Sequence, residues 1–406
     1  MSITVAVPRE TFPGEWRVAL TPTAAALLIK SKLAVIVESG AGVEAGFTDE
    51  AYIAKGAKIA PRAEVFASAD ILLEVRSTVA GSSDFAALKT SALIIGFCDP
   101  LGNPQALAAS ASKGVSILSM ELIPRITRAQ SMDALSSQAN IAGYKAVIMA
   151  AEASPKIFPM LMTAAGTLQA ARVFVIGAGV AGLQAISTAR RLGGVVSAFD
   201  VRSAVKDQVQ SVGAKFVELP VDAAEGTGGY AKEQSAEQQK KQADLMAKVI
   251  AESDIIITTA AIPGKPAPKL IPATAVAKMQ PGSVIVDLAA ERGGNCELTE
   301  PGKTIVTHGV TIIGHTNIPA TVPLHSSQMY ANNLVKLLGI MVDKEGKLTI
   351  NLKDDVVAGS LVTHAGEVVH DRVRDILGLP KAAAETTAPS TVSNVKLETA
   401  TAGGSR

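Results

Sequence analysis

The sequence predicts an α/β protein of two domains, each an open, mostly parallel sheet flanked by helices, with a cleft between the domains. Its 406 residues exceed the length that one hydrophobic core usually serves. Hydrophobic residues make up 48% of the chain but aromatic residues only 3%, which is typical of parallel strands buried on both faces. Short apolar runs alternate with amphipathic stretches, which indicates parallel strands joined by crossover helices.

The first domain is predicted from the strand and helix signals of the first third of the chain. A helix is expected from Thr21 through Leu33, because Thr21 can cap a helix that has Pro22 at its first position. Apolar runs predict strands at residues 3–8, 34–40, 70–75, 92–97 and 116–120. Together these elements predict one open α/β domain.

The alternation restarts near residue 171 and predicts a second domain. Strands are expected at residues 173–176, 195–200, 214–220, 254–260, 283–289 and 310–315. A helix over 326–342 and a strand over 349–352 are expected to return the chain to the first domain. The predicted division is therefore 1–140 with 325–380, and 141–324. Residues 381–406 are rich in Ala, Thr and Ser and are expected to form a disordered tail.

Charge and cysteine content limit the classes of partner and compartment. A formal charge of +1 gives no electrostatic reason to expect nucleic acid or an anionic membrane surface. Cys98 and Cys296 are far apart and in no metal-ligand spacing, so we expect unpaired thiols in a reducing compartment. No secretory signal and no run of about 18 apolar residues is visible. We therefore expect a soluble, cytoplasmic protein that can still dock on a membrane complex.

A glycine-rich motif is the strongest local signal for chemistry. Gly177, Gly179 and Gly182 directly follow the apolar strand 173–176 and precede a helical run over 183–192. In a Rossmann-like domain the first glycine permits a tight turn, the second lets the backbone approach a pyrophosphate, and the third allows close helix packing. The helix N-terminus then attracts the phosphates. The motif predicts a dinucleotide site.

Asp200 ends the next predicted strand, eighteen residues after Gly182. A carboxylate there can accept hydrogen bonds from a ribose 2′-hydroxyl and would repel a 2′-phosphate, so NAD is favoured over NADP. Arg202 is a nearby group that could help accommodate a phosphate. Glycine turns also arise for packing alone, but strand, loop, helix and acid occur here in the required order, which favours the cofactor interpretation.

A polar stretch over residues 124–138 lies between the two predicted sets of strands. It holds Arg125, Arg128, Gln130 and Asp133, and a hinge crossing would give such groups access to an interdomain cleft. A solvated linker with a helix cap at Ser131 or Asp133 explains the same residues equally well. Residue types alone leave both interpretations open.

Five segments together resemble the NAD(H)-binding component of proton-translocating nicotinamide nucleotide transhydrogenases over nearly the whole chain. They cover residues 124–147, 175–186, 228–233, 258–270 and 283–297. The resemblance implies that Arg125, Gln130 and Asp133 contact the nicotinamide end of the cofactor. It also implies that GGYAKE, at 228–233, is a mobile loop that closes over NAD(H); without the resemblance, a flexible turn is the favoured interpretation of this segment.

The contact residues implied by the motif and the resemblance fall into two sets. The nicotinamide-side set is Arg125, Ile126, Thr127, Arg128, Gln130, Asp133 and Ser136. The adenosine- and pyrophosphate-side set is Gly177, Gly179, Val180, Gly182, Asp200, Val201, Arg202, Gly229, Tyr230, Gln242 and Ala261. Ala261 falls where the family often has Leu, so the contact at that point is expected to be looser.

The resemblance implies reversible hydride transfer between NAD(H) on this chain and NADP(H) on a partner subunit. Membrane-embedded subunits would couple this transfer to proton translocation, and the chain would form a homodimer, peripheral on the inner face of the cytoplasmic membrane. Two nicotinamides exchange a hydride directly, so no proton donor is needed. We expect no covalent intermediate, no metal site and no nucleic-acid partner.

Alanine dehydrogenases are the main alternative, because the N-terminal pattern PRE followed by RVALTP resembles theirs as well. Such an enzyme needs a substrate clamp and a general acid/base. Arg17 stands at the clamp position and Glu291 at the position of an acid. The lysine of that family is missing at Glu74-Val75-Arg76, and its histidine is replaced in the run Phe97-Cys98-Asp99.

The five histidines do not supply the missing base. All of them lie in the last quarter of the sequence, at His308, His315, His325, His364 and His370. A third interpretation is a non-catalytic NAD-sensing or scaffold protein. It would need the glycine loop but not the polar stretch, so Arg125, Gln130 and Asp133 count against it.

Overall fold

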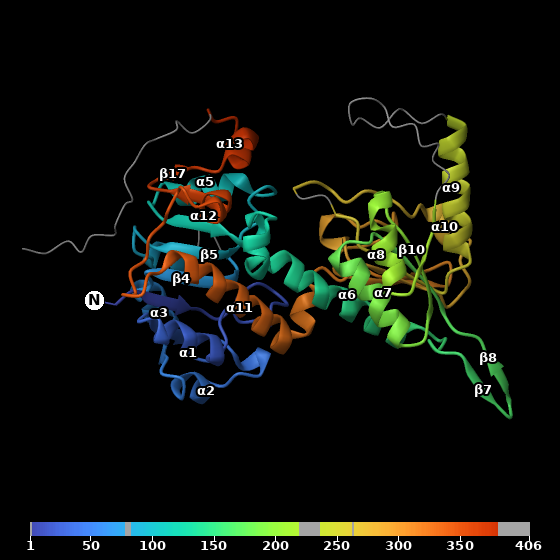
Figure 1. Ribbon diagram of the computed structural model, residues 1–406, viewed down its shortest axis with the longest axis horizontal. Helices are drawn as coiled ribbons and strands as arrows, with labels where there is room; N and C mark the ends of the chain where they lie inside the picture. Colours follow the sequence, from blue (N-terminus) through green and yellow to red (C-terminus); the bar gives the residue numbers. More distant parts are fainter. Residues whose placement is uncertain (1, 78–82, 219–235, 262–263, 381–406) are drawn as a thin grey trace, which may run out of the picture. The chain divides into compact units, whose positions relative to one another are not determined.

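The computed structural model describes residues 2–77, 83–218, 236–261 and 264–380 (Figure 1). Two compact units divide the chain. The first unit comprises the residues up to Glu10, Val18–Asp133 and the residues from Tyr330 onward; the second comprises Thr11–Arg17 and Ala134–Met329. The predicted domain boundaries at 140/141 and 324/325 stay a prediction.

The first unit is built on a sheet in the order β17-β16-β6-β5-β4-β1-β2-β3. From β6 through β3 all neighbouring strands are parallel, while β16 pairs antiparallel with β6 and with β17. Its strands are β1 Thr4–Val7, β2 Ala34–Glu38, β3 Lys58–Ala60, β4 Ile71–Arg76, β5 Leu93–Phe97, β6 Ser116–Ser119, β16 Leu361–His364 and β17 Glu367–Val368. Its helices include α1 Pro22–Lys30, α2 Asp49–Ile53, α3 Arg62–Ser68, α4 Ser83–Ala87, α5 Pro104–Ala111, α12 Asp355–Ser360 and α13 Asp371–Leu377.

Local chemistry explains how the first unit begins. The Thr21 hydroxyl accepts a hydrogen bond from the backbone N–H of Ala24 at 3.3 Å, and Pro22 occupies the first turn of α1. This cap satisfies one of the helix N–H groups that lack an intrahelical partner. Alternate residues of the strands, among them Leu72 and Ile94, are buried in one apolar cluster. The expected helix start and the five expected strands are therefore present.

The second unit has a sheet in the order β11-β10-β9-β12-β13-β15-β14, parallel except at its β14 edge. Its strands are β9 Arg172–Ile176, β10 Val195–Phe199, β11 Lys215–Phe216, β12 Ile255–Thr258, β13 Val284–Asp287, β14 Thr304–Thr307 and β15 Val310–Ile313. Its helices are α6 Ala134–Ala153, α7 Val180–Arg191, α8 Lys206–Ser211, α9 Ala236–Ala251 and α10 Ala273–Val276. A further helix, α11 Pro323–Met341, contains the division between the units. The strand order reverses between β9 and β12, as in Rossmann-like folds.

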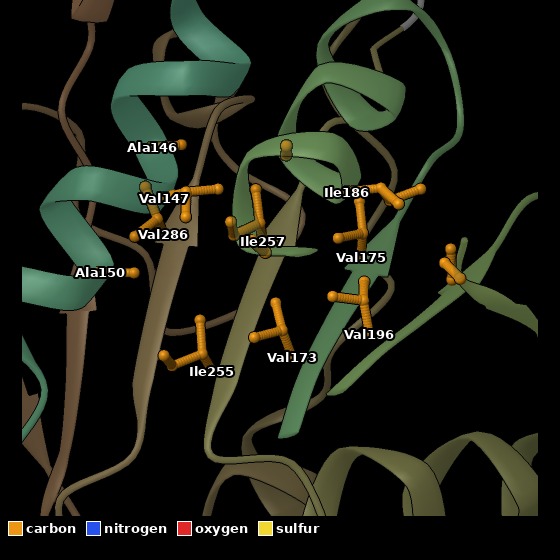
Figure 2. Packing of buried hydrophobic residues seen from close by; sticks show 14 of the residues in the cluster. Ala146, Val147, Ala150, Val173, Val175, Ile186, Val196, Ile255, Ile257 and Val286 are labelled. Atoms are coloured by element: carbon orange, nitrogen blue, oxygen red, sulfur yellow. The ribbon is translucent and has the colours of Figure 1, made fainter. Parts of the chain in front are cut away.

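Figure 2 shows why the strands of the second unit are almost continuously apolar. Val173 and Val175 of β9 point to one face of the sheet, together with Ile255 and Ile257 of β12. Ala146, Val147 and Ala150 of α6 close the same cluster. Phe174 and Ile176 of β9 are buried in a second cluster instead. Because successive side chains of a strand alternate between faces, both faces of this sheet are packed.

A glycine sets how closely α6 and α7 pack. A Cβ atom on Gly143 of α6 would lie 2.1 Å from the carbonyl oxygen of Ala181 in α7. Real Cβ atoms do not approach backbone oxygens that closely, so only glycine lets the two helices pack at this separation. Close packing against α6 therefore fixes the position of α7, the helix that follows the glycine motif.

The predicted α/β class, with two Rossmann-like and mostly parallel sheets flanked by helices, is confirmed. The strand expected at residues 349–352 is wrong. There the Asn351 side chain accepts a hydrogen bond from Lys353 N, and Asp354 caps α12. Polar side chains that bond the local backbone compete with strand pairing. The return to the first sheet is made by β16 and β17.

A hairpin of two short strands stands away from the sheet of the second unit (Figure 1). It consists of β7 Leu161–Thr163 and β8 Gly166–Leu168, which pair antiparallel. All six strand residues are exposed, and Met162 is 74% exposed. No sequence signal predicts this hairpin, since short strands without a buried face give no alternating pattern.

Candidate nucleotide-binding site

The glycine motif lies between β9 and α7, at the carboxyl end of the strand where the strand order reverses. Gly177 has a φ of +97°, which favours glycine, and a Cβ there would lie 2.4 Å from Thr259 Oγ1. A Cβ on Gly182 would lie 1.8 Å from the carbonyl oxygen of Gly177. A Cβ on Gly179 would meet nothing within 4 Å. Two glycines are thus required by packing, and the third borders open space.

Asp200 directly follows β10 and accepts hydrogen bonds on both carboxylate oxygens. The backbone N–H of Ala178, inside the glycine motif, donates to Oδ2 at 2.8 Å. The backbone N–H of Arg202 donates to Oδ1 at 2.9 Å, and its guanidinium donates to both oxygens. Burial alone would raise the pKa of Asp200, but these hydrogen bonds and the Arg202 charge outweigh it and lower the pKa. Asp200 is therefore an ionised acceptor next to the glycine motif.

The chain beyond β12 supports the glycine motif through residues that lie outside the motif itself. Thr259 Oγ1 donates to the Gly177 carbonyl oxygen at 3.0 Å. Asn295 accepts from Ala260 N at 3.0 Å and donates to Ala260 O at 2.8 Å, so its amide pairs with both backbone groups of that residue. This clamp fixes the backbone that leaves β12 beside the motif.

Asp287, at the end of β13, anchors the Asn295 segment. The side chain is fully buried and accepts from the Thr258 and Thr299 hydroxyls at 2.9 and 2.6 Å. The backbone N–H groups of Ala289 and Cys296 also donate to it, each at 3.0 Å. A buried carboxylate is tolerated when such donors surround it. The only sequence signal for this anchoring role was that the predicted strand over residues 283–289 contains a carboxylate.

The polar stretch belongs to the first unit and forms a short 3-10 helix, Thr127–Met132, after Arg125. Ala129 and Met132 are buried and anchor it, and Asn333 of α11 donates to the Ser131 carbonyl oxygen at 2.9 Å. Five of the predicted contact residues on this stretch are exposed, namely Arg125, Ile126, Thr127, Arg128 and Gln130. Asp133 is partly buried. The stretch presents side chains to solvent from a fixed backbone.

Arg128 is engaged within the first unit. Its guanidinium donates two hydrogen bonds of 2.9 Å to the carboxylate of Asp354 and a further one to Asp355. Asp354 also caps α12 through Val356 N and Val357 N. The hydrogen bond with Asp354 raises the pKa of Arg128. This ion pair joins the polar stretch to the start of α12.

The remaining predicted contact residues are distributed over the second unit. Ser136 is partly buried on α6, and Val180 is the exposed first residue of α7. Val201 is 85% exposed beside Asp200, and Ala261 is exposed after β12. Gln242 is on α9, but its side chain is outside the described residues, as are Gly229 and Tyr230 altogether. The second unit therefore gathers Gly177, Gly179, Gly182, Asp200 and Arg202 at one end of β9 and β10.

Arg17, the position of a substrate clamp in alanine dehydrogenases, is buried in a polar network of the second unit. It donates to both carboxylate oxygens of Glu15 at 2.6 Å and to Gln138 Oε1 at 2.9 Å. Asn317 bonds both members of the ion pair. Burial would raise the pKa of Glu15, but the bonds with Arg17 outweigh it and lower the pKa. The Arg17 guanidinium thus already donates hydrogen bonds to acceptors within the protein.

The run Phe97-Cys98-Asp99, which stands where alanine dehydrogenases have a histidine, holds no imidazole. The Phe97 ring packs against Tyr330, with ring centroids 5.2 Å apart, and Cys98 is buried. Burial raises the pKa of the Cys98 thiol well above its usual range. His364, one of the five histidines, contacts the Ser116 hydroxyl at 2.9 Å, and burial lowers its pKa. No helix in the described residues is both long enough and apolar enough to cross a membrane.

Two family models match most of the chain. The alanine dehydrogenase/PNT N-terminal domain matches residues 6–142, and the alanine dehydrogenase/PNT C-terminal domain matches residues 146–371. The first range includes the polar stretch, and the second includes the glycine motif and Asp200.

Relatives named as transhydrogenase subunits are much more similar to the chain than alanine dehydrogenases are. An NAD(P) transhydrogenase alpha-subunit protein of Rhodospirillum rubrum is 50% identical over 374 residues, 90% of this chain and 97% of that protein. A crystal structure of a transhydrogenase from Sinorhizobium meliloti has a TM-score of 0.82 and 46% identity, covering 90% of this chain and all of that one. The alanine dehydrogenase of Mycobacterium tuberculosis is 28% identical, covering 93% of this chain and 97% of that protein.

Proposed function

Since this chain belongs to the alanine dehydrogenase/PNT family, we propose that it is the NAD(H)-binding component of a proton-translocating nicotinamide nucleotide transhydrogenase. It exchanges a hydride between its own NAD(H) and NADP(H) on a partner subunit. Over 374 aligned residues, which span almost all of that protein, the chain is 50% identical to a transhydrogenase alpha-subunit protein. This degree of identity supports the transhydrogenase role over that of an amino acid dehydrogenase.

One observation carries the cofactor assignment: the Asp200 carboxylate is held 2.8 Å from Ala178 N, inside the glycine motif. A carboxylate at that place can accept hydrogen bonds from ribose hydroxyls, and it repels a 2′-phosphate. The open space at Gly179 supports the approach of a pyrophosphate to the backbone. The chain therefore prefers NADH to NADPH.

On the nicotinamide side, Arg125, Gln130 and Asp133 hydrogen-bond the carboxamide and ribose and hold the ring in a reactive orientation. Arg125 and Gln130 are exposed, so their hydrogen-bonding groups are accessible to a ligand. NAD(H), when bound, supplies the hydride chemistry. The protein binds it, orients it and excludes water from it.

The chain acts as a homodimer, together with membrane-embedded subunits and an NADP(H)-binding domain on the inner face of the cytoplasmic membrane. The hairpin β7–β8 supports self-association. Leu161, Met162 and Leu168 are exposed on it, next to Met160, which is 57% exposed. Contiguous exposed apolar side chains mark protein contact surfaces more often than isolated ones do.

Titration of the purified protein with NADH and with NADPH, followed by nucleotide fluorescence, tests this proposal. NADH should bind well and NADPH poorly. Asp200→Ala should weaken the binding of NADH and so reduce the difference between the two affinities. Equal or tighter binding of NADPH by the wild type would overturn the assignment of Asp200.

The alternative activity is tested on the same sample with L-alanine and NAD, and with pyruvate, ammonia and NADH. We expect no turnover, since Arg17 is engaged by Glu15, Gln138 and Asn317. A rate of even about 1 per second, the low end for ordinary enzymes, would restore the dehydrogenase interpretation. Glu291 would then be the first residue to test.

A further inference from the structure

The Asp200 carboxylate has no acceptor position left for a ligand in this structure. Oδ1 accepts from Arg202 N at 2.9 Å and Arg202 Nε at 3.0 Å, and Oδ2 accepts from Ala178 N at 2.8 Å and Arg202 Nη2 at 3.0 Å. A carboxylate offers about four lone-pair positions. The Arg202 guanidinium therefore occupies half of them.

Two of these four donors are fixed and two are replaceable. The N–H groups of Ala178 and Arg202 are part of the backbone that follows β9 and β10, strands that pair up to Ile176 and Phe199. The guanidinium is different, because the Arg202 side chain is 58% exposed, and within the described part of the chain it contacts no other carboxylate. Water can replace the contacts of the exposed guanidinium when the pair opens, whereas the buried Asp200 carboxylate, whose side chain is 7% exposed, then needs donors from a ligand.

The resemblance implies that Arg202 is a cofactor contact. We propose instead that Arg202 is a displaceable cap on Asp200 that sets nucleotide specificity, an inference that rests on the proposed binding of NAD(H). The ribose hydroxyls of NADH take the two positions that the guanidinium leaves, and Arg202 moves into solvent. Each NADH molecule that binds must open this ion pair. The cap therefore lowers the affinity for NADH.

The same guanidinium acts in the opposite direction on NADPH. A 2′-phosphate cannot donate to Asp200 and is repelled by its charge, but a planar guanidinium next to it can bind two phosphate oxygens. Arg202 thus offsets part of the repulsion from Asp200. Its presence weakens the binding of NADH, strengthens that of NADPH and reduces the discrimination between them.

The test compares Arg202→Gln, Arg202→Lys and the wild type, with dissociation constants for NADH and NADPH measured at one ionic strength. Arg202→Gln should bind NADH about two- to five-fold more tightly and NADPH more weakly by a similar factor, because the cation of this ion pair is exposed even though its carboxylate is buried. Arg202→Lys keeps the charge but not the two-pronged contact, and its affinities should fall between those of the wild type and Arg202→Gln. Arg191→Gln is the matched control, because it removes one exposed charge in the last turn of α7; it should change neither constant.

Each outcome separates this inference from the proposed function. Weaker NADH binding by Arg202→Gln would mean that Arg202 is itself a ligand of NADH, and unchanged affinities would mean that the ion pair does not compete; either result overturns the cap while leaving NAD(H) binding intact. If Arg191→Gln changed both dissociation constants as much as Arg202→Gln does, the effect would come from net charge alone, and this result would overturn the cap as well. A wild type that binds neither nucleotide would overturn both the cap and the proposed function.

Discussion

The glycine motif of the second unit and the polar stretch of the first unit are built in opposite ways. Around Gly177 and Gly182 the contacts are made by backbone atoms, buried strands and a carboxylate, Asp200, that already has partners. The polar stretch instead presents exposed side chains, such as Arg125 and Gln130, from a short 3-10 helix and the residues before it. The first region depends on packing for its geometry, and the second does not contribute its exposed groups to the core.

This difference separates two tasks that a hydride-transfer protein must perform. Holding a large nucleotide requires a fixed cradle for the pyrophosphate and ribose, which packing supplies. Orienting the reacting ring requires a few polar groups at one end of the ligand. Changes in the first region should therefore alter stability and affinity, and changes in the second should alter rate.

The largest effect is expected from Arg17→Gln in the buried network of the second unit. This change leaves the Glu15 carboxylate buried without its cation, a change that typically costs about 3–5 kcal/mol. Arg128→Gln is the matched control, because it removes an exposed ion pair of the first unit. Thermal unfolding should show a much lower melting temperature for Arg17→Gln and almost the wild-type melting temperature for Arg128→Gln. Similar melting temperatures for the two variants would contradict the view that buried contacts of the second unit carry stability and exposed side chains of the polar stretch do not.

A smaller effect is expected from Gly182→Ala compared with Gly179→Ala. The Cβ of Gly182→Ala would lie 1.8 Å from Gly177 O and force α7 away from β9. Such overpacking costs about 1–3 kcal/mol and should lower the melting temperature by roughly 2–12 °C. Gly179→Ala borders open space, so it should keep the melting temperature and weaken only NADH binding. If Gly179→Ala binds NADH as the wild type does, the pyrophosphate does not approach there.

The smallest effect is expected from Gln130→Asn in the polar stretch. Shortening this exposed side chain should slow hydride transfer to an NADP analogue on the partner subunit about ten-fold, roughly 1.4 kcal/mol of lost alignment, with a smaller change in NADH affinity. Gln105→Asn, another exposed glutamine of the first unit, is the control and should change neither quantity. If affinity falls as much as rate, the stretch is only a binding element; if neither changes, Gln130 does not act on the ring.

The sequence predicted those parts of the fold whose signals are local. Thr21 with Pro22 marked the start of α1, and the apolar runs marked both sheets. The hairpin β7–β8 has no buried face, so no periodicity indicated it. The edge strand β14 alternates between exposed and partly buried residues, but its sequence has Ile305 and Val306 side by side and therefore shows no apolar alternation. The strand expected at 349–352 failed because Asn351 and Asp354 bond the local backbone, an effect that apolar periodicity does not register.

The same distinction holds for the candidate site. The glycine motif and Asp200 lie within one βαβ unit, so their spacing in the sequence reports their proximity in space. Asn295, which clamps Ala260 from 35 residues away, could not be found from spacing, because only the folded sheet brings β12 and the segment after β13 together. The pairing of Arg202 with Asp200 was likewise invisible until side-chain geometry was available. The role of the polar stretch still rests on family resemblance.

The most direct test of the transhydrogenase role follows the hydrogen itself. NADH carrying deuterium at the reacting carbon of the nicotinamide is mixed with the protein, its NADP-binding partner and an NADP analogue, and the products are analysed by mass spectrometry. Direct exchange between two nicotinamides predicts that the label appears in the reduced NADP analogue and not in water, with no need for L-alanine or pyruvate. Label lost to water, or transfer only when an amino acid or a keto acid is added, would contradict the proposed function.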